Sequence, residues 1–172
     1  MRENQLYAKK KKCYFMQKRI PFLGHFVSEA GIEMNPEKIE AVKAWPPIKM
    51  IKQLRGFLGL TGYYRKFIKD YSKKALQLTK LLKDTEKFEW TEDQEKAKQE
   101  LINALTSAPI LKRPDYTKKY TVTTDASDHA IGVVLSQEHG PIVFLSKTFT
   151  DVERRWSTYN KELFAIIYTL EK

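Results

Sequence analysis

The spacing of apolar residues changes along the chain, and each change indicates a different kind of element. Near the start, short apolar runs predict strands. Cys13–Met16 suits a buried strand, and Phe22–Val27 a second one in which Gly24 indicates a bend or the close approach of another backbone. The pattern is helical over about 35–106, strand-like beyond that, and helical again from about residue 156.

Capping residues divide the helical stretch into three helices. Asn35 can cap a helix and Pro36 fits a first helical turn, so a helix is predicted to begin there. A second helix is predicted over residues 51–68, and a third is predicted over 92–105 with Thr91 as its cap. These helices form the largest part of an expected α+β fold.

The second predicted helix contains three glycines at a spacing of three: Gly56, Gly59 and Gly62. Each costs about 1 kcal/mol relative to alanine inside a helix, so the repeat needs a reason. Close packing against another helix is one explanation, and the approach of a phosphate backbone is the other. The spacing favours neither.

After residue 109 the chain predicts an antiparallel meander with one helix on it. Residues 120–124 alternate and end at Asp125, and two further short apolar runs follow at 131–135 and 141–146. The helix from about 156 to 172 carries an apolar stripe that is expected to pack on the sheet. The stripe consists of Tyr159, Leu163, Ile166, Ile167 and Leu170.

Charge separates the two halves of the chain. The net charge is +10, with 42% hydrophobic and 30% charged residues, as in a globular protein. Residues 1–90 hold 20 Lys and Arg against 9 Asp and Glu, whereas residues 91–172 hold 11 against 12. The positive first half suggests a polyanionic partner. A solvated basic surface is the alternative.

Aromatic residues alternate with basic ones at Tyr63-Tyr64-Arg65-Lys66-Phe67. Stacking surfaces next to phosphate-binding cations are typical of nucleic-acid binding. A helix that buries its tyrosines and phenylalanine would show the same pattern. The sequence alone leaves both interpretations open.

Other features narrow the class of protein. No apolar run reaches the roughly 20 residues of a membrane helix, so no membrane association is expected. A single cysteine, Cys13, excludes a disulfide framework and a cysteine zinc site, and is expected to be buried. An intracellular location, cytoplasmic or nuclear, is expected.

Two carboxylates are candidates for metal-dependent chemistry. Asp125 ends an otherwise apolar strand, and Glu162 lies at the edge of the apolar stripe of the last helix. If that helix packs on the meander, the two side chains can converge. Mg²⁺ is bound by one or two carboxylates plus waters and phosphates, and paired Mg²⁺ ions support phosphodiester cleavage. Taken singly, each residue is more often a capping or solvated carboxylate.

Four stretches of the chain resemble the Pol polyprotein of gypsy-type LTR retrotransposons. They are Lys12–Phe15 with Phe22–His25, then Leu54–Ile68, then Phe88–Trp90 with Ala108–Leu111, and Thr124–Ser127 with Gly132–Gln137 and Tyr159–Leu163. Their order and spacing follow that family over nearly the whole chain.

The resemblance implies four regions. These are the end of a reverse transcriptase palm (residues 1–34), the thumb (35–87), a connecting segment (88–118) and the first part of a ribonuclease H-like domain (119–172). The implied fold is a set of palm-end strands, a helical thumb, and a partial three-stranded antiparallel sheet with one helix.

The resemblance also implies site residues. Asp125 and Glu162 match the first two of four acidic ligands of the ribonuclease H Mg²⁺ ions, and Phe22, Leu23, Gly24 and His25 would hold the primer 3′ end. The thumb would follow the template–primer backbone through residues that all lie in its glycine-spaced segment. Those residues are Arg55, Gly59, Gly62, Tyr64, Arg65 and Lys66.

The parent activity implied is RNA-directed DNA synthesis with cleavage of the RNA in RNA–DNA hybrids. The polymerase aspartates and two further acidic ligands are absent, so we expect a fragment that is inactive alone. Its expected partners are hybrid or template–primer nucleic acid and the rest of the Pol polyprotein. A non-catalytic nucleic-acid-binding remnant is the alternative, and an unstable fragment is a third. Met50 stands where the family has a capping Thr, and Asn160 where it has an acidic residue.

Overall fold

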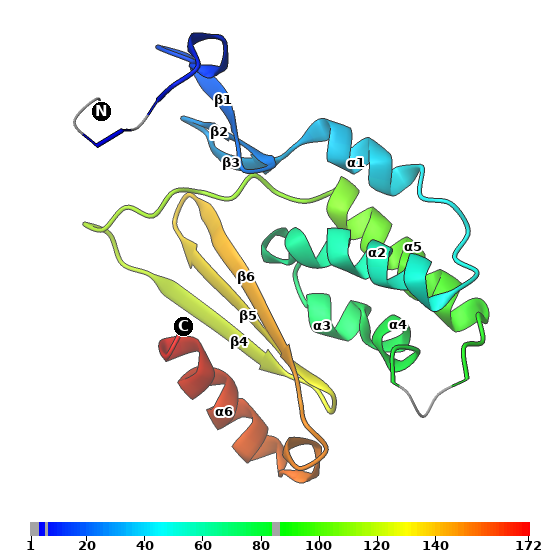
Figure 1. Ribbon diagram of the computed structural model, residues 1–172. Coiled ribbons are helices and arrows are strands. Elements are labelled where there is room, and N and C mark those ends of the chain that lie inside the picture. The colour runs from blue at the N-terminus through cyan, green and yellow to red at the C-terminus, as the bar shows by residue number, and fades with distance from the viewer. Residues whose placement is uncertain (1–3, 6, 84–86) are drawn as a thin grey trace.

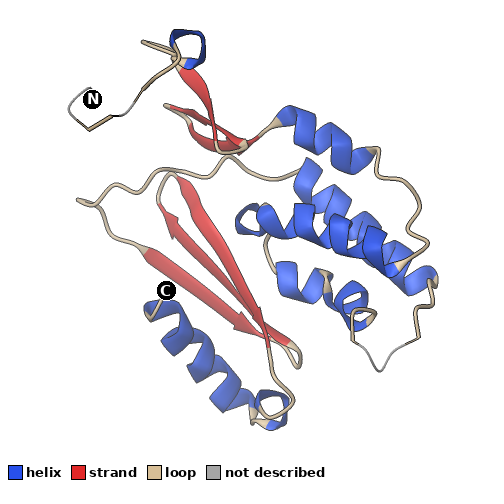
Figure 2. Cartoon of the chain, in the orientation of Figure 1, coloured by secondary structure: helices blue, strands red, loops and turns tan. Residues whose placement is uncertain are grey.

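The computed structural model describes residues 4–5, 7–83 and 87–172, in which a helical region lies beside two small antiparallel sheets (Figures 1 and 2). The strands are β1 Arg19–Phe22, β2 His25–Ser28, β3 Gly31–Met34, β4 Thr121–Ala126, β5 Ala130–Gln137 and β6 Gly140–Thr148. The α-helices are α1 Pro36–Lys43, α2 Ile51–Tyr63, α3 Tyr71–Lys74, α4 Leu76–Lys80, α5 Glu92–Thr106 and α6 Thr158–Leu170. Short 3₁₀ helices are η1 Lys10–Lys12, η2 Arg65–Phe67 and η3 Glu153–Arg155. The predicted α+β class is confirmed.

The first sheet has the strand order β1-β2-β3. Leu23 and Gly24 form the turn between β1 and β2 with φ of 45° and 71°. Two consecutive positive φ values are typical of a two-residue hairpin turn. The prediction that Gly24 lies inside a strand was therefore wrong, because the apolar run is two strands joined by a turn.

The predicted strand at Cys13–Met16 was also wrong. This segment follows η1 without forming a strand, and Phe15 and Met16 are 74% and 103% exposed. Cys13 is half-buried at the surface and its thiol donates to the carbonyl of Lys9 over 3.3 Å. An apolar run becomes a strand only where a neighbouring strand pairs with it, and none of the described residues does so.

The helix caps follow the sequence closely. Asn35 Oδ1 accepts a hydrogen bond from the Glu37 amide over 2.9 Å, and Thr91 forms a capping box with Gln94. Met50 offers no side-chain cap, but Gln53 Oε1 accepts from the Lys49 amide over 2.7 Å. That bond ties the residue before the cap to the first turn of α2, and no side chain at position 50 accepts from the first amides of the helix.

Helix α2 ends five residues before the predicted limit at Ile68. The chain tightens into η2, and Tyr64, Phe67 and Ile68 are each 1% exposed. This tight turn directs all three side chains into the large core. Arg65 and Lys66 consequently lie on η2 and not on α2.

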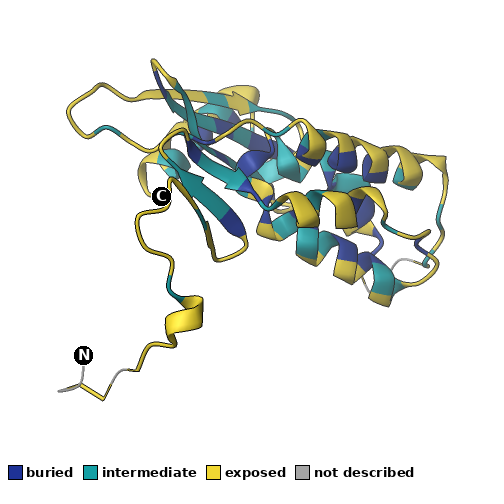
Figure 3. Cartoon of the chain, turned by 90° about the horizontal axis from the view of Figure 1, so that it is seen from above, coloured by how far each residue is buried: buried dark blue, intermediate teal, exposed yellow. Residues whose placement is uncertain are grey.

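The large core joins the helices to one face of the second sheet. Leu54, Phe57 and Leu101 are fully buried in it, and Phe144 of β6 and Leu111 of the connecting segment belong to the same cluster. In Figure 3 the exposed residues of the helical region lie on its outer surfaces, and the buried ones between the helices. The helices and the sheet therefore share one core.

The second sheet is the predicted meander, with the order β4-β5-β6. Helix α6 covers one face of it (Figure 1), and a small core forms there from Ile131, Phe149 and Ala165. The predicted packing stripe of α6 was wrong, since its five residues are 43–77% exposed. Phe164 and Tyr168 face the sheet instead. Because α6 is apolar on both sides, its periodicity does not identify the packed side.

The connecting segment links the two sheets. Ile32 of β3 and Leu111 exchange backbone hydrogen bonds of 2.8 and 2.9 Å, and the Lys112 amide donates to the Pro141 carbonyl over 2.7 Å. Gly31 permits this approach, because an added Cβ would collide with the Leu111 carbonyl oxygen. Within the described ranges, none of the helices has the length and hydropathy needed to cross a bilayer.

Candidate nucleic-acid interface and carboxylate site

The β1–β2 turn is fastened to the end of α2. The Tyr63 hydroxyl donates to the Leu23 carbonyl over 2.5 Å, and the Tyr64 hydroxyl donates to the Gly24 carbonyl over 2.7 Å. The side chains of Phe22 and Leu23 remain 59% and 71% exposed. The two tyrosines thus hold the turn in place while it presents apolar side chains to solvent.

His25 lies beneath the turn, 8% exposed, and is surrounded by the rings of Tyr63, Tyr64 and Phe67 at 5.3–5.5 Å. Its Nδ1 lies 2.6 Å from the Leu23 carbonyl oxygen, an acceptor, so Nδ1 carries the hydrogen. Burial lowers the pKa of His25; the hydrogen bond to Leu23 opposes this shift. His25 therefore supports the turn through this hydrogen bond and through its packing against the three rings.

Helix α2 exposes one basic, glycine-containing face. Lys52, Arg55, Gly56, Gly59 and Tyr63 are exposed and span about 100° of the helix at 100° per residue. This set is called the α2 face below. It lies opposite the side that packs into the large core, so it is free to meet a ligand.

The structure gives the three glycines different environments. An added Cβ would lie 3.6 Å from the Trp45 ring at Gly56 and 3.4 Å from the Tyr71 hydroxyl at Gly62, which are ordinary packing distances. At Gly59 it would meet nothing within 4 Å. Packing within the described chain therefore gives no reason for Gly59, and this position is open to an approaching backbone.

Three further residues predicted to contact nucleic acid, Tyr64, Arg65 and Lys66, have different environments. Lys66 lines a cavity of about 310 Å³ with Phe22, His25 and Tyr63, and burial lowers the pKa of its ammonium group. Arg65 is exposed but donates from Nη2 to the Ser146 carbonyl over 2.6 Å. Tyr64 is 1% exposed, so it supports the turn and offers no stacking surface.

The two candidate carboxylates lie at the same end of the second sheet. Asp125 is the penultimate residue of β4, and Glu162 is in the second turn of α6. Between the two elements, Lys161 Nζ donates to Asp128 Oδ1 over 3.2 Å. The ion pair holds the start of α6 against the turn that follows β4.

Asp125 and α6 nevertheless belong to different faces of the sheet. Ala126 packs in the small core under α6, and adjacent strand residues point to opposite faces, so Asp125 points toward α3. Neither Asp125 nor Glu162 makes a side-chain hydrogen bond or ion pair with another described residue. In the described part of the chain, His, Cys, Asp and Glu form no group of three that could hold a metal. Convergence of the two carboxylates stays a prediction.

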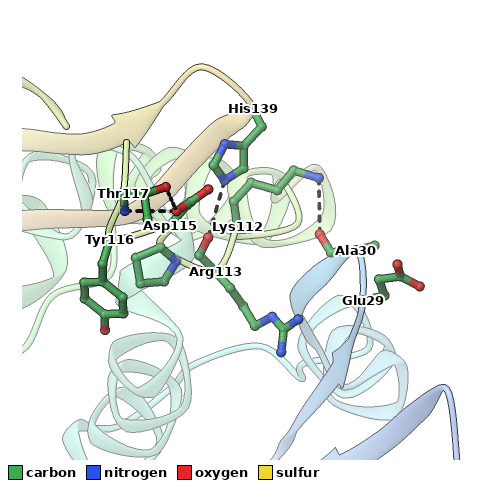
Figure 4. A pocket seen from close by; sticks show the side chains of 9 residues that line it. Glu29, Ala30, Lys112, Arg113, Asp115, Tyr116, Thr117 and His139 are labelled. Carbon is green, nitrogen blue, oxygen red and sulfur yellow. Dashed lines mark hydrogen bonds between the residues drawn. The ribbon is translucent and has the colours of Figure 1, made fainter. Parts of the chain in front are cut away.

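A larger cavity, of about 770 Å³, lies where the two sheets meet (Figure 4). Lys112 Nζ donates to the Ala30 carbonyl over 3.2 Å, and His139 Nε2 lies 3.3 Å from the Arg113 carbonyl oxygen. Hydrogen bonds from Thr117 lower the pKa of Asp115. None of the predicted site residues lines this cavity.

The chain is similar to known proteins of retrotransposons. Residues 90–172 match the RNase H-like domain found in reverse transcriptase. The chain is 46% identical over 162 residues to the Retrovirus-related Pol polyprotein from transposon 297 of Drosophila melanogaster, covering 91% of the chain and 15% of that protein. It is 39% identical over 173 residues to that of transposon gypsy of the same organism, covering 94% of the chain and 17% of that protein.

A relative from another organism and a solved structure are also similar to this chain. The Transposon Tf2-3 polyprotein of Schizosaccharomyces pombe is 36% identical over 176 residues, or 99% of the chain and 13% of that protein. The foamy viral protease-reverse transcriptase in complex with RNA/DNA hybrid superposes with a TM-score of 0.82 at 24% identity, covering 94% of this chain and 22% of that one. At that identity the likeness shows the fold. The chain spans less than a fifth of the length of these Pol relatives.

Proposed function

We propose that the chain is the nucleic-acid-binding part of a retrotransposon polymerase. Residues 90–172 match the RNase H-like domain found in reverse transcriptase, and more than nine-tenths of the chain is similar to Pol polyproteins of transposons 297 and gypsy. The ligand proposed is an RNA–DNA hybrid or a template–primer duplex. The parent protein would carry out RNA-directed DNA synthesis and cleave the RNA of the hybrid.

The open, basic α2 face is the observation that carries this proposal. Lys52 and Arg55 supply positive charge, and Gly59 leaves room for a sugar–phosphate backbone. The β1–β2 turn presents Phe22 and Leu23 beside the same end of α2 through its bonds to Tyr63 and Tyr64. A duplex lying along α2 would meet cations first and the apolar turn at its end.

The regions proposed are the end of a palm (1–34), a thumb (35–87), a connecting segment (88–118) and the first part of a ribonuclease H-like domain (119–172). The rest of the Pol polyprotein is the proposed protein partner. The shared core of helices and sheet fits a chain whose regions work as one body.

Asp125 and Glu162 are the proposed Mg²⁺ ligands. Asp125 is exposed and Glu162 half-buried, and neither is engaged by a described side chain, as carboxylates that receive a cation must be. Mg²⁺ at this place would activate water for attack on a phosphodiester. An ion held by both residues would lie beyond the end of β4, where the sheet no longer separates the two side chains, and Lys161 would keep α6 close to that end.

A second candidate is nucleic-acid binding without catalysis. The α2 face favours it, because two cations and an open glycine can bind a phosphate backbone without a metal. Two carboxylates leave a second ion without protein ligands, and cleavage by two metals needs both ions. We therefore expect no cleavage of labelled hybrid in Mg²⁺ above the level of an Asp125→Asn control.

Binding of fluorescent hybrid by the full chain tests the proposal. The Lys52→Gln/Arg55→Gln variant removes both cations of the α2 face. The matched control, Lys118→Gln/Lys119→Gln, removes two exposed lysines before β4. Anisotropy at low salt should show weaker binding for the first variant only. Equal affinities of the two variants would contradict the assignment of the α2 face.

A further inference from the structure

A row of three residues crosses the second sheet on the face that meets the helical region. Asp125 of β4 pairs with Gly132 of β5, and Gly132 pairs with Ser146 of β6. Residues directly opposite each other in antiparallel strands direct their side chains to the same face. The candidate metal ligand therefore shares its row with two residues that contact the helical region, Gly132 next to Asp70 and Ser146 next to Ser72.

Ser146 connects this row to the helical region by hydrogen bonds. It is 2% exposed, and its hydroxyl accepts from the Ser72 amide over 3.0 Å and lies 3.0 Å from the Ser72 hydroxyl. Its carbonyl accepts from Arg65 Nη2 over 2.6 Å. Buried polar groups with complete partners fix one arrangement, because any other leaves donors or acceptors unpaired.

Gly132 connects the row to Asp70 by shape. An added Cβ on Gly132 would collide with Asp70 Oδ1 and lie 3.2 Å from its Cγ. Asp70 stands just before α3 in the left-handed conformation, with φ of 57°. Its side chain thus occupies the space above Gly132. Asp70 and Lys73 also line a small cavity together with Asp125.

We propose that Asp70, Gly132 and Ser146 form a positioning joint that sets the place of Asp125 relative to the helical region. Asp70 is the positioning residue, since its carboxylate lies over Gly132 and lines the same small cavity as Asp125. A shift of the helical region when it binds a ligand would move Asp70 and Ser72, and through them the row that contains Asp125. The catalytic meaning of Asp125 rests on the proposed function, but the joint itself does not.

The test uses the full chain without nucleic acid or metal, so its outcome is independent of the proposed function. Gly132→Ala places a methyl group against Asp70. Because the atom that it meets is the end of a side chain that can rotate, amide hydrogen exchange in β4 and β5 should accelerate by at most about tenfold, the factor expected for modest overpacking. Amides of α2 and α5, far from the joint in the large core, should exchange as before.

Variants at Asp70 show whether the effect of Gly132→Ala comes from contact with the Asp70 side chain or from a general loss of stability. Asp70→Ala vacates the space, so Gly132→Ala/Asp70→Ala should return to within about twofold of Asp70→Ala alone. Asp70→Asn keeps the shape, so Gly132→Ala/Asp70→Asn should remain accelerated relative to Asp70→Asn alone. Gly59→Ala is the matched glycine control, because its methyl group would meet nothing.

Two results would overturn the joint. Unchanged exchange in Gly132→Ala would show that the two regions do not meet there. Equal acceleration of Gly132→Ala with and without Asp70→Ala would show that Gly132 is needed for a reason unrelated to Asp70.

Discussion

The helical region and the sheet–α6 unit are built on cores of very different size. The helices enclose a large cluster that includes the fully buried Leu54, Phe57 and Leu101, whereas the cluster described between α6 and the sheet is built on Ile131, Phe149 and Ala165. The other face of the sheet joins the large cluster through Phe144. The second sheet thus shares the larger core with the helical region, whereas α6 is held by the smaller one.

The region with the larger core also carries more positive charge. The positive excess lies in residues 1–90, and the α2 face displays part of it. The region with the larger core is therefore also the one suited to hold a polyanion. Most buried apolar residues lie in the cluster that supports the α2 face, and few lie in the cluster under α6. We therefore expect the α2 face to be rigid and α6 to be held less firmly.

The largest predicted effect is at Phe57. Phe57→Ala removes a fully buried ring from the large core and should lower the free energy of unfolding by about 3–5 kcal/mol. Since the sheet shares this core, both regions should lose stability together in urea unfolding.

Phe149→Ala, in the small core, should increase hydrogen exchange in α6 and leave that of α2 unchanged. Faster hydrogen exchange in α2 of Phe149→Ala would contradict the separation of the large core from the small one.

The helix caps give a smaller test of the same comparison. Asn35 caps α1 through a 2.9 Å bond, and Ser157 caps α6 through a 3.3 Å bond to the Asn160 amide. Alanine at either position should cost about 1 kcal/mol locally. Asn35→Ala should lower the urea midpoint of the whole chain, whereas Ser157→Ala should mainly increase exchange in the first turn of α6. Equal shifts of the midpoint would contradict this.

A pH-dependent effect is expected at His25. Burial lowers the pKa of His25 in the folded chain, while the unfolded chain takes up the proton near about pH 6.5. Below that pH the unfolded state binds more protons, so the free energy of unfolding should fall as pH drops. His25→Phe, which keeps an aromatic ring, should flatten this dependence between about pH 7 and 5. His129→Phe, at an exposed position, is the control.

The smallest effect is expected on the outer side of α6. Ile166 is 47% exposed, so Ile166→Ser should change the free energy of unfolding by no more than about 0.5 kcal/mol. A much larger loss in urea unfolding would show that this side is packed in solution.

Local features of the fold could be predicted from the sequence, because their causes are local. Asn35 and Thr91 accept backbone hydrogen bonds within their own first turns, and the meander follows from alternating runs separated by short turns. The packed side of α6 could not be predicted, since both of its sides are apolar.

Features that depend on residues far apart in the sequence could not be predicted from local patterns. Tyr64 looked like a stacking residue because it stands beside Arg65, but its partner is Gly24, 40 residues away. Gly132 appeared only as part of a family motif, and its reason is the side chain of Asp70. Asp125 and Glu162 were found by their residue types and by resemblance, and their convergence stays a prediction.

The salt dependence of hybrid binding tests the central claim most directly. For the full chain, the logarithm of the binding constant should fall linearly with the logarithm of salt concentration. Each phosphate contact contributes a slope of at most about 0.9. Lys52→Gln/Arg55→Gln should reduce the slope by up to about 2, while Lys118→Gln/Lys119→Gln should leave it unchanged. A slope unaffected by the first pair, or reduced equally by both, would contradict binding through the α2 face.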